Sequence, residues 1–429
     1  MSQSLAEALE VIKALGSPDE MELLAERGTA PARQPKVNTH IHLPPNFSAF
    51  ETTSQAMNLA REQGIGVLGV ANYYDYRVYA DFVAEARRAG IFPLFGMECI
   101  ALIDDLVRGG VLINDPGNPG RMYICGKGIT RLAPMSGEAE RLIGIIRHND
   151  SARMAEMTAR VSQIFAAHGV DTNLNADAVI DMVVSRHNCP RDMVCLQERQ
   201  VAQAFQESLF RHVPAAGRIE KLSEIIGAES QAADAGDTVT IQKEIRAHLM
   251  KAGKRAFVAE TFVNFDQAFR LILELGGIPC YPTLADGASP ICEFEDPIEK
   301  LIESMRRHNI HCMELIPIRN EPEVLVRYVR AMRAAHLAVT AGTEHNVLDM
   351  LAIEPACIGK KPVPEEIKEI FWEGACVVAA HQFLTLHGRC GFVDGDGRPN
   401  AAYDSAEGRI EAFRSLGAAV IQRYYEKNA

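Results

Sequence analysis

The sequence predicts an α/β fold in which a buried, parallel sheet alternates with helices. Short apolar stretches such as IGVLGVAN, residues 65–72, alternate with amphipathic stretches that end in glycine. Several apolar stretches end in a polar or charged residue, as the strands of α/β barrels do at their carboxyl ends. The chain has 429 residues, 47% of them hydrophobic, so it can bury a large core. These observations favour a barrel or an open sheet built from βα units.

The first part of the chain supplies three of the expected strands. Residues 1–35 are expected to form an N-terminal helix and a linker, and strands follow at 36–42, 65–72 and 91–102. Helices at 54–64 and 79–90 separate these strands, and each ends at a glycine that can adopt the left-handed conformation. Strands connected by helices run parallel, so a parallel sheet is predicted.

A helical insertion interrupts this pattern. Residues 135–255 show helical periodicity and no clear strand, within a sheet-forming region that spans 36–395. The alternation then resumes, with helices at 265–277, 297–309 and 322–336 and strands at 278–286, 310–318 and 337–346. Residues 396–429 are expected to add a C-terminal helix.

Composition narrows the class of protein. A formal net charge of −12 argues against a nucleic-acid-binding surface, which would carry clustered lysine and arginine. Ten cysteines are scattered without a C-x-x-C pair, which is typical of a reduced compartment. The N-terminus lacks the features of a signal peptide, and no apolar stretch is long enough to span a membrane. We therefore expect a cytoplasmic protein with no membrane partner.

Four potential metal ligands follow apolar strands. His40 and His42 are spaced i and i+2, so a strand aims both imidazoles to one side. Glu98 and Glu344 each end an apolar stretch, where a buried carboxylate must be paired, hydrogen-bonded or bound to a metal. Together they suit one Zn, Mn or Fe ion, which could activate water. Taken singly, each residue also fits a structural role, as a hydrogen-bonded strand end, a helix cap or an arginine partner.

At these residues the chain resembles the PHP family, the polymerase and histidinol phosphatase-like metal-dependent phosphoesterases. The stretch NTHIH looks like the family's H-x-H motif, and IFPLFGMECI looks like its P-G-x-E strand. Later stretches are similar to further family motifs: GVLGVANYYD to T-D-H, RMYICGKG to His-(apolar)-Leu-Gly, ILELGGIPCYPTLAD to AGGIPVLAHP, and LAVTAGTEHN to G-[ST]-D-x-H. The resemblance covers residues 36–130 and 255–350 and implies a distorted seven-stranded β/α barrel.

The chain departs from the family at several ligand positions. Tyr73, Tyr123 and Tyr281 stand where the family has histidine, Asn72 replaces an aspartate, Asn346 replaces the last histidine, and Phe47 or Ser48 takes the place of a further ligand. A neutral phenol is a poor ligand, because its pKa near 10 keeps it protonated at neutral pH. Only the residues that match the family's first metal remain, namely His40, His42, Glu98 and Glu344. The resemblance thus implies a site for one metal ion, with His345 able to replace Asn346 if the loop shifts by one residue.

Three functions remain open at this stage. The first is a hydrolase, of phosphoesterase type, that uses one divalent metal ion to act on a small molecule, with phosphorylated compounds among the candidates. Its catalytic candidates are Tyr73, Tyr123, Tyr281 and His345, while Lys127, Arg131 and Arg319 could neutralise an anionic substrate group. The second is an inactive barrel that binds a small molecule or has a regulatory role. The third, by analogy of fold with amidohydrolases, is a reaction on a carbohydrate or carboxylate.

Overall fold

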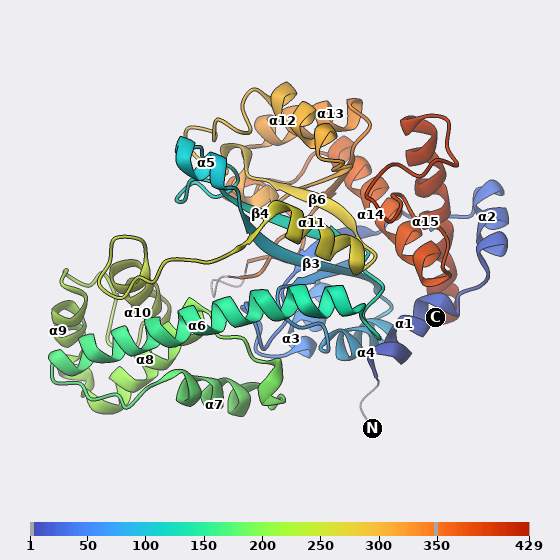
Figure 1. Ribbon diagram of the computed structural model, residues 1–429. Helices are drawn as coiled ribbons and strands as arrows, with labels where there is room; N and C mark the ends of the chain where they lie inside the picture. The colour runs from blue at the N-terminus through green and yellow to red at the C-terminus, as the bar shows by residue number, and fades with distance from the viewer. Residues whose placement is uncertain (1–3, 347–350, 429) are drawn as a thin grey trace.

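A seven-stranded sheet, nearly closed into a barrel, forms the centre of the computed structural model, which describes residues 4–346 and 351–428 (Figure 1). The strands follow one another around the barrel in the order β1 (Lys36–Ile41), β2 (Ile65–Asn72), β3 (Phe92–Leu102), β4 (Arg121–Lys127), β6 (Ile278–Thr283), β7 (Cys312–Leu315) and β8 (Ala338–Ala341). The short strand β5 (Val263–Asn264) pairs with the end of β3. Between β8 and β1, a single parallel bridge joins Glu344 to Ile41. The barrel expected from the resemblance is confirmed.

The prediction of an all-parallel sheet is wrong at one strand. Strand β4 runs antiparallel to both of its neighbours, β3 and β6. A parallel pair needs a crossover that carries the chain back along the whole strand. The only helix between β3 and β4 is α5 (Asp104–Gly109), whose six residues span about 9 Å. This connection therefore returns the chain at the same end of the barrel.

Helices cover the outside of the sheet. They are α3 (Thr53–Glu62), α4 (Tyr79–Ala89), α11 (Phe265–Glu274), α12 (Ile298–Arg307), α13 (Pro322–Ala334), α14 (Glu365–Leu386) and α15 (Ala406–Asn428). Helix α14 is buried along most of its length and packs against both β8 and β1, the two edges of the incomplete closure. Gly374 makes this approach possible, because an added Cβ would lie 2.0 Å from the carbonyl oxygen of Val339. Short 3-10 turns lie at Arg191–Met193, Ala285–Gly287, Pro317–Arg319 and Ile358–Lys360.

The helical insertion is present, as the sequence predicts. Helix α6 (Gly137–Ala167) runs 31 residues out from the barrel and reaches α7 (Ala176–His187), α8 (Glu198–His212), α9 (Ala215–Ile226), α10 (Thr238–Ile245) and a π-helical turn at Arg246–Met250 (Figure 1). Apolar side chains from Met154 to Ala256 form a hydrophobic core that is distinct from that of the barrel. The insertion is thus a separately packed helical lobe at the side of the barrel.

The N-terminal segment contains two helices, where one helix and a linker were expected. Helix α1 (Leu5–Lys13) packs on α4 and α14, and α2 (Pro18–Glu26) packs on α15. Ser4 and Ser17 cap the two helices, each accepting a hydrogen bond from the backbone three residues ahead. Among the described residues, no helix is both long and apolar enough to cross a membrane.

Candidate metal centre

Two histidines at the carboxyl end of strand β1 converge with a glutamate from the second half of β3. His40, His42 and Glu98 are almost completely buried. The Nε2 atoms of His40 and His42 lie 3.4 Å apart, and Oε2 of Glu98 lies 3.2 Å from Nε2 of His42 and 3.7 Å from Nε2 of His40. The i, i+2 spacing therefore does direct both imidazoles to one point, and β3 brings a carboxylate to the same point. We call these three residues the His–His–Glu triad.

The geometry of this triad fits a tetrahedral metal ion. Zinc binds nitrogen and oxygen at about 2.0–2.2 Å, which places two ligands of a tetrahedron about 3.3 Å apart. The three donor distances in the triad bracket this value. The pKa of Glu98 lies below its ordinary value: burial raises it, and hydrogen bonds and charge from the two histidines outweigh that effect. The carboxylate is thus held in the ionised form that a metal requires.

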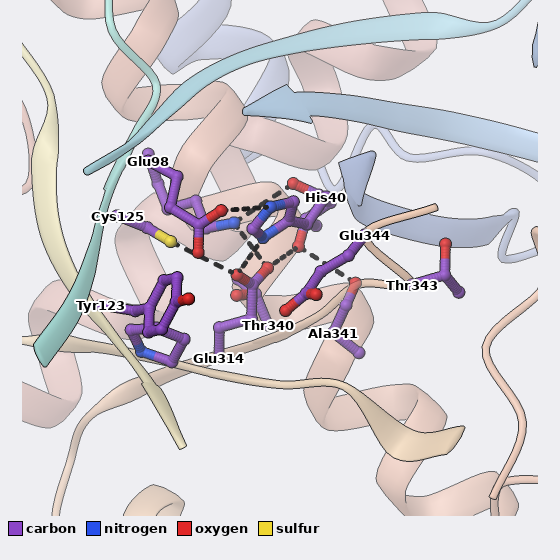
Figure 2. Close-up of polar contacts among 12 residues, drawn as sticks. His40, Glu98, Tyr123, Cys125, Glu314, Thr340, Ala341, Thr343 and Glu344 are labelled. Carbon is purple, nitrogen blue, oxygen red and sulfur yellow. Dashed lines mark hydrogen bonds and ion pairs between the residues drawn. The ribbon is translucent and has the colours of Figure 1, made fainter. Parts of the chain in front are cut away.

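A fourth buried residue, Glu314 on β7, orients His40. Its Oε2 lies 2.7 Å from Nδ1 of His40, on a different side of the ring from Glu98 (Figure 2). A carboxylate at Nδ1 orients the ring so that Nε2 faces the metal position, an arrangement common around metal-binding histidines. Burial lowers the pKa of His40, but charge from Glu314 outweighs this effect and raises it well above its ordinary value, so a metal would displace the proton at Nε2. Burial raises the pKa of Glu314, but charge from Lys127 and His40 outweighs this effect and lowers it to about 2. Glu314 falls within the strand expected at 310–318, but no motif in the sequence gives it a role.

His42 lacks a comparable partner. Its Nδ1 is buried and has no hydrogen-bond partner among the described residues. The ring instead stacks on Tyr73, with centroids 5.6 Å apart, and meets Phe47 edge-on at 5.1 Å. Burial lowers the pKa of His42 and favours the neutral form that can bind a metal.

Lys127 and Arg131 do not lie where a substrate anion would need them. The ammonium group of Lys127 is buried and forms an ion pair with Glu314. Because β4 runs antiparallel, its carboxyl end points away from the triad, and Arg131 follows at the opposite end of the barrel, where its backbone bonds to Leu275. The expectation that Lys127 and Arg131 neutralise the substrate is therefore wrong. Of the three basic residues, only Arg319 reaches the site.

A cavity of about 340 Å³ opens above the triad. We call it the metal cavity; its polar lining comprises Tyr73, Glu98, Asn114, Asp115, Tyr123, Thr283, Arg319, Glu344 and Asn346. Tyr73 and Tyr123 therefore line this cavity, and their catalytic role stays a prediction. The Tyr73 hydroxyl is buried without a hydrogen-bond partner among the described residues, whereas that of Tyr123 accepts a hydrogen bond from Nη2 of Arg121 at 3.0 Å. Burial raises the pKa of both phenols, so they stay protonated.

The other two catalytic candidates lie away from the metal cavity. Tyr281 is fully buried and donates a hydrogen bond of 2.7 Å to Glu295. His345 stacks on Phe50, and its ring nitrogens contact the hydroxyl of Thr343 and the carbonyl of Leu351. Neither residue lines the cavity, so the expectation that they face the substrate is not met.

Thr283 reaches the metal cavity in place of Tyr281. Its hydroxyl is buried without a hydrogen-bond partner in the described part of the chain. If the motif AGGIPVLAHP is matched to residues 275–284 without a gap, its histidine falls on Thr283. The match that gave Tyr281 the histidine position aligned Pro282 with the proline of the motif's His-Pro. That match lies two residues away from the gap-free one.

Glu344 lies at the cavity wall but is engaged by an arginine. Its two carboxylate oxygens accept hydrogen bonds from Arg319, at 2.9 and 2.5 Å, and Asn346 donates a further bond of 2.6 Å. Its carboxylate is not part of the close donor cluster formed by the triad. Gly342 lets this loop press against β1, because a Cβ at Gly342 would lie 2.3 Å from Cβ of His40. The role of Glu344 as a metal ligand therefore stays a prediction, and it requires Arg319 to release the carboxylate.

A second donor group, formed by His40, Cys125 and Glu314, overlaps the triad. Sγ of Cys125 lies 3.8 Å from Oε2 of Glu314 (Figure 2). Burial raises the pKa of Cys125 to about 12, so its thiol is protonated, and the Lys127 ammonium already contacts Glu314. These features favour the triad over this group as the place for a metal.

Comparison with known proteins agrees with the fold. No family model matches the chain, and no curated protein matches it in sequence. Among solved structures, a "putative metal-dependent phosphoesterase" from Bifidobacterium adolescentis is similar with a TM-score of 0.50 and 15% identity, covering 80% of this chain and 96% of that one. An amidohydrolase from Chromobacterium violaceum, solved with bound sulfate and no metal, also gives 0.50 and 15%, covering 78% and 96%. At this identity the similarity establishes a shared PHP-like barrel fold and not a shared activity.

Proposed function

We propose that the protein is a metal-dependent hydrolase that binds one divalent ion at the His–His–Glu triad and acts on a small phosphorylated molecule. One observation carries the proposal: three buried donor atoms lie 3.2–3.7 Å from one another, and one of the histidines is oriented by a carboxylate. A divalent ion bound there would supply water activation and Lewis-acid chemistry. The two structures named above both carry hydrolase names, which supports this class.

The residues around the triad suit the handling of an anionic ester. Arg319 is the basic residue that lines the metal cavity within the described part of the chain, and it can turn from Glu344 to a phosphate oxygen in bidentate fashion. The Tyr73 hydroxyl, which lacks a protein partner among the described residues, can donate a hydrogen bond to a substrate oxygen. Because the phenol is protonated, it can also supply a proton to a leaving group.

The alternative is a barrel that binds a ligand without catalysis. The Arg319–Glu344 pair favours it, because this pair occupies a carboxylate that the resemblance assigns to the metal. The two functions differ in whether a metal is bound and whether a phosphoester is turned over.

Metal analysis of the purified chain tests the proposal. After loading with Zn, Mn or Fe and removal of free metal, mass spectrometry is expected to find about one ion per chain. The variant His40→Ala/His42→Ala should retain none. A matched control is His308→Ala/His387→Ala, which removes two histidines whose Nδ1 atoms hydrogen-bond to carbonyls of their own helices, away from the triad. Wild-type protein without a metal, or equal metal in all three proteins, would contradict the metal centre. A loaded chain that releases no phosphate from a panel of phosphomonoesters would instead favour the binding barrel.

A further inference from the structure

The carboxylate of Glu344 is paired with an arginine at the edge of the metal cavity. Its two oxygens accept hydrogen bonds from Arg319 at 2.9 and 2.5 Å, and both side chains line the cavity. A bidentate pair between guanidinium and carboxylate fixes the orientation of both groups. While this pair is intact, the carboxylate stays outside the close donor group that the His–His–Glu triad forms.

The backbone of Glu344 is nevertheless fixed directly beside the triad. Its amide donates a hydrogen bond of 2.8 Å to the carbonyl of His40, and its carbonyl accepts one of 2.9 Å from the amide of His42 (Figure 2). Glu344 has a φ of 58°, a conformation that residues other than glycine rarely adopt and that persists only where the surroundings hold it. The backbone is therefore pinned to both metal-binding histidines, and the side chain is the part that can turn.

A metal ion at the triad has use for a further carboxylate. The triad supplies three donors, whereas zinc takes four or five ligands. Of the other two carboxylates that line the metal cavity, Glu98 already belongs to the triad and Asp115 is held by Nε of Arg121 at 3.1 Å. Glu344 is thus the carboxylate whose backbone adjoins both histidines and whose present partner is a side chain of the cavity itself.

Arg319 can leave Glu344 without a change in its own backbone. It ends the short turn Pro317–Arg319, and the next residue, Asn320, is anchored by hydrogen bonds of 2.9 Å to the carbonyl of Leu284 and to Asp286. The side chain of Arg319 is 39% exposed, so an anion that enters the cavity can reach it. A guanidinium group binds a tetrahedral oxyanion in the same bidentate manner as a carboxylate.

We propose that Arg319 and a metal ion compete for Glu344, so that an anion which binds Arg319 releases Glu344 to the metal. The metal and an anionic ligand then bind with positive cooperativity, and each tightens the binding of the other by the same factor. A neutral ligand leaves Arg319 on Glu344 and gains nothing from the metal. This competition rests on the metal centre of the proposed function, and it makes Arg319 a specificity-determining residue that favours anionic ligands.

Zinc affinity measured with and without inorganic sulfate tests this coupling. Sulfate is a tetrahedral dianion that the protein has no ester bond to cleave in. Competition with a chromophoric chelator gives the zinc affinity of the full chain, and sodium chloride keeps the ionic strength constant. In wild type, sulfate should tighten zinc binding about fivefold or more, the usual scale of coupling between two sites. Calorimetric titration of sulfate into zinc-loaded and metal-free protein should give the same factor.

Two variants separate the competition from other causes. In Glu344→Gln, Arg319 loses its counter-charge, so the metal-free chain should bind sulfate about fivefold more tightly and sulfate should no longer change the zinc affinity. In Arg319→Met, zinc affinity should be independent of sulfate. The matched control is Glu366→Gln, which removes the partner of Arg330 from a pair with contacts of 2.7 and 2.6 Å on the outside of the barrel. It should keep the coupling of wild type.

Three results would overturn the inference. Zinc affinity in wild type that is insensitive to sulfate would exclude the coupling and leave the proposed metal centre standing. Coupling that persists in Glu344→Gln would mean that sulfate touches the metal directly. If Glu344→Gln does not fold, Arg319→Met replaces it because its side chain is partly exposed, and persistent coupling there would be equally decisive. An absence of zinc from wild type under all conditions would instead overturn the proposed function, and this inference with it.

Discussion

Replacing Glu314 with glutamine tests how the triad is supported. The Glu314 carboxylate is completely buried, faces Nδ1 of His40, pairs with Lys127 and accepts from the hydroxyl of Thr39. Glu314→Gln leaves the Lys127 ammonium buried without its counter-charge. Removing one partner of a buried ion pair costs about 3–5 kcal/mol, so the free energy of unfolding should fall by that amount.

The double variant Glu314→Gln/Lys127→Met separates stability from metal binding. It removes both charges, so it should be destabilised less than either single variant, and the coupling energy should be several kcal/mol. His40 still loses the carboxylate at Nδ1, so zinc affinity should fall about 10- to 100-fold in Glu314→Gln and in the double variant alike. In Lys127→Met, whose carboxylate remains, zinc affinity should change less.

Two assays on the same four proteins decide the matter. Urea denaturation of the metal-free chains gives the unfolding free energies, and competition with a chromophoric chelator gives the zinc affinities. The reasoning is refuted if the single-variant costs simply add, or if zinc affinity in the double variant equals that of wild type.

Three further predictions concern other parts of the chain. Glu295 accepts hydrogen bonds from Tyr281 and two backbone amides, yet burial raises its pKa from 4.5 to about 7. The folded state therefore binds the proton of Glu295 more tightly than the unfolded state does. This contribution to the free energy of unfolding is fully present below pH 4.5 and should fall by about 3 kcal/mol as the pH rises through 7. Urea denaturation of Glu295→Gln should show this dependence removed, and an unchanged pH profile would count against it. Tyr73→Phe removes a buried hydroxyl without a partner among the described residues, so the free energy of unfolding should rise by about 1 kcal/mol and the melting temperature with it. Phosphoester turnover should fall. A lower melting temperature would mean that the hydroxyl has a hydrogen-bond partner in the free protein. Arg319→Met should release Glu344 and tighten zinc binding about tenfold if Glu344 is a ligand, and unchanged affinity would exclude that role.

The sequence predicted the local part of this structure well. The stretch IGVLGVAN coincides with β2, Ile65–Asn72, because a continuous apolar run between a helix end and polar residues has few alternatives. His40, His42 and Glu98 meet as expected, because period-two alternation and strand ends fix where they point.

What the sequence could not predict depends on distant pairings. The carboxylate of Glu314 meets His40 across 274 residues, and no local pattern indicates that contact. The antiparallel direction of β4 places Lys127 under the triad and not at the mouth. The pocket where the helical insertion meets the barrel is lined by residues between 47 and 262, which are far apart in the sequence.

X-ray absorption of the zinc-loaded chain tests the central claim most directly, because it reports the atoms bound to the metal. The account predicts a shell of nitrogen and oxygen at about 2.0–2.1 Å with two imidazoles, reduced in His42→Ala, and no sulfur. A sulfur neighbour at about 2.3 Å would place the metal between His40, Cys125 and Glu314, and would contradict the His–His–Glu triad as the metal centre.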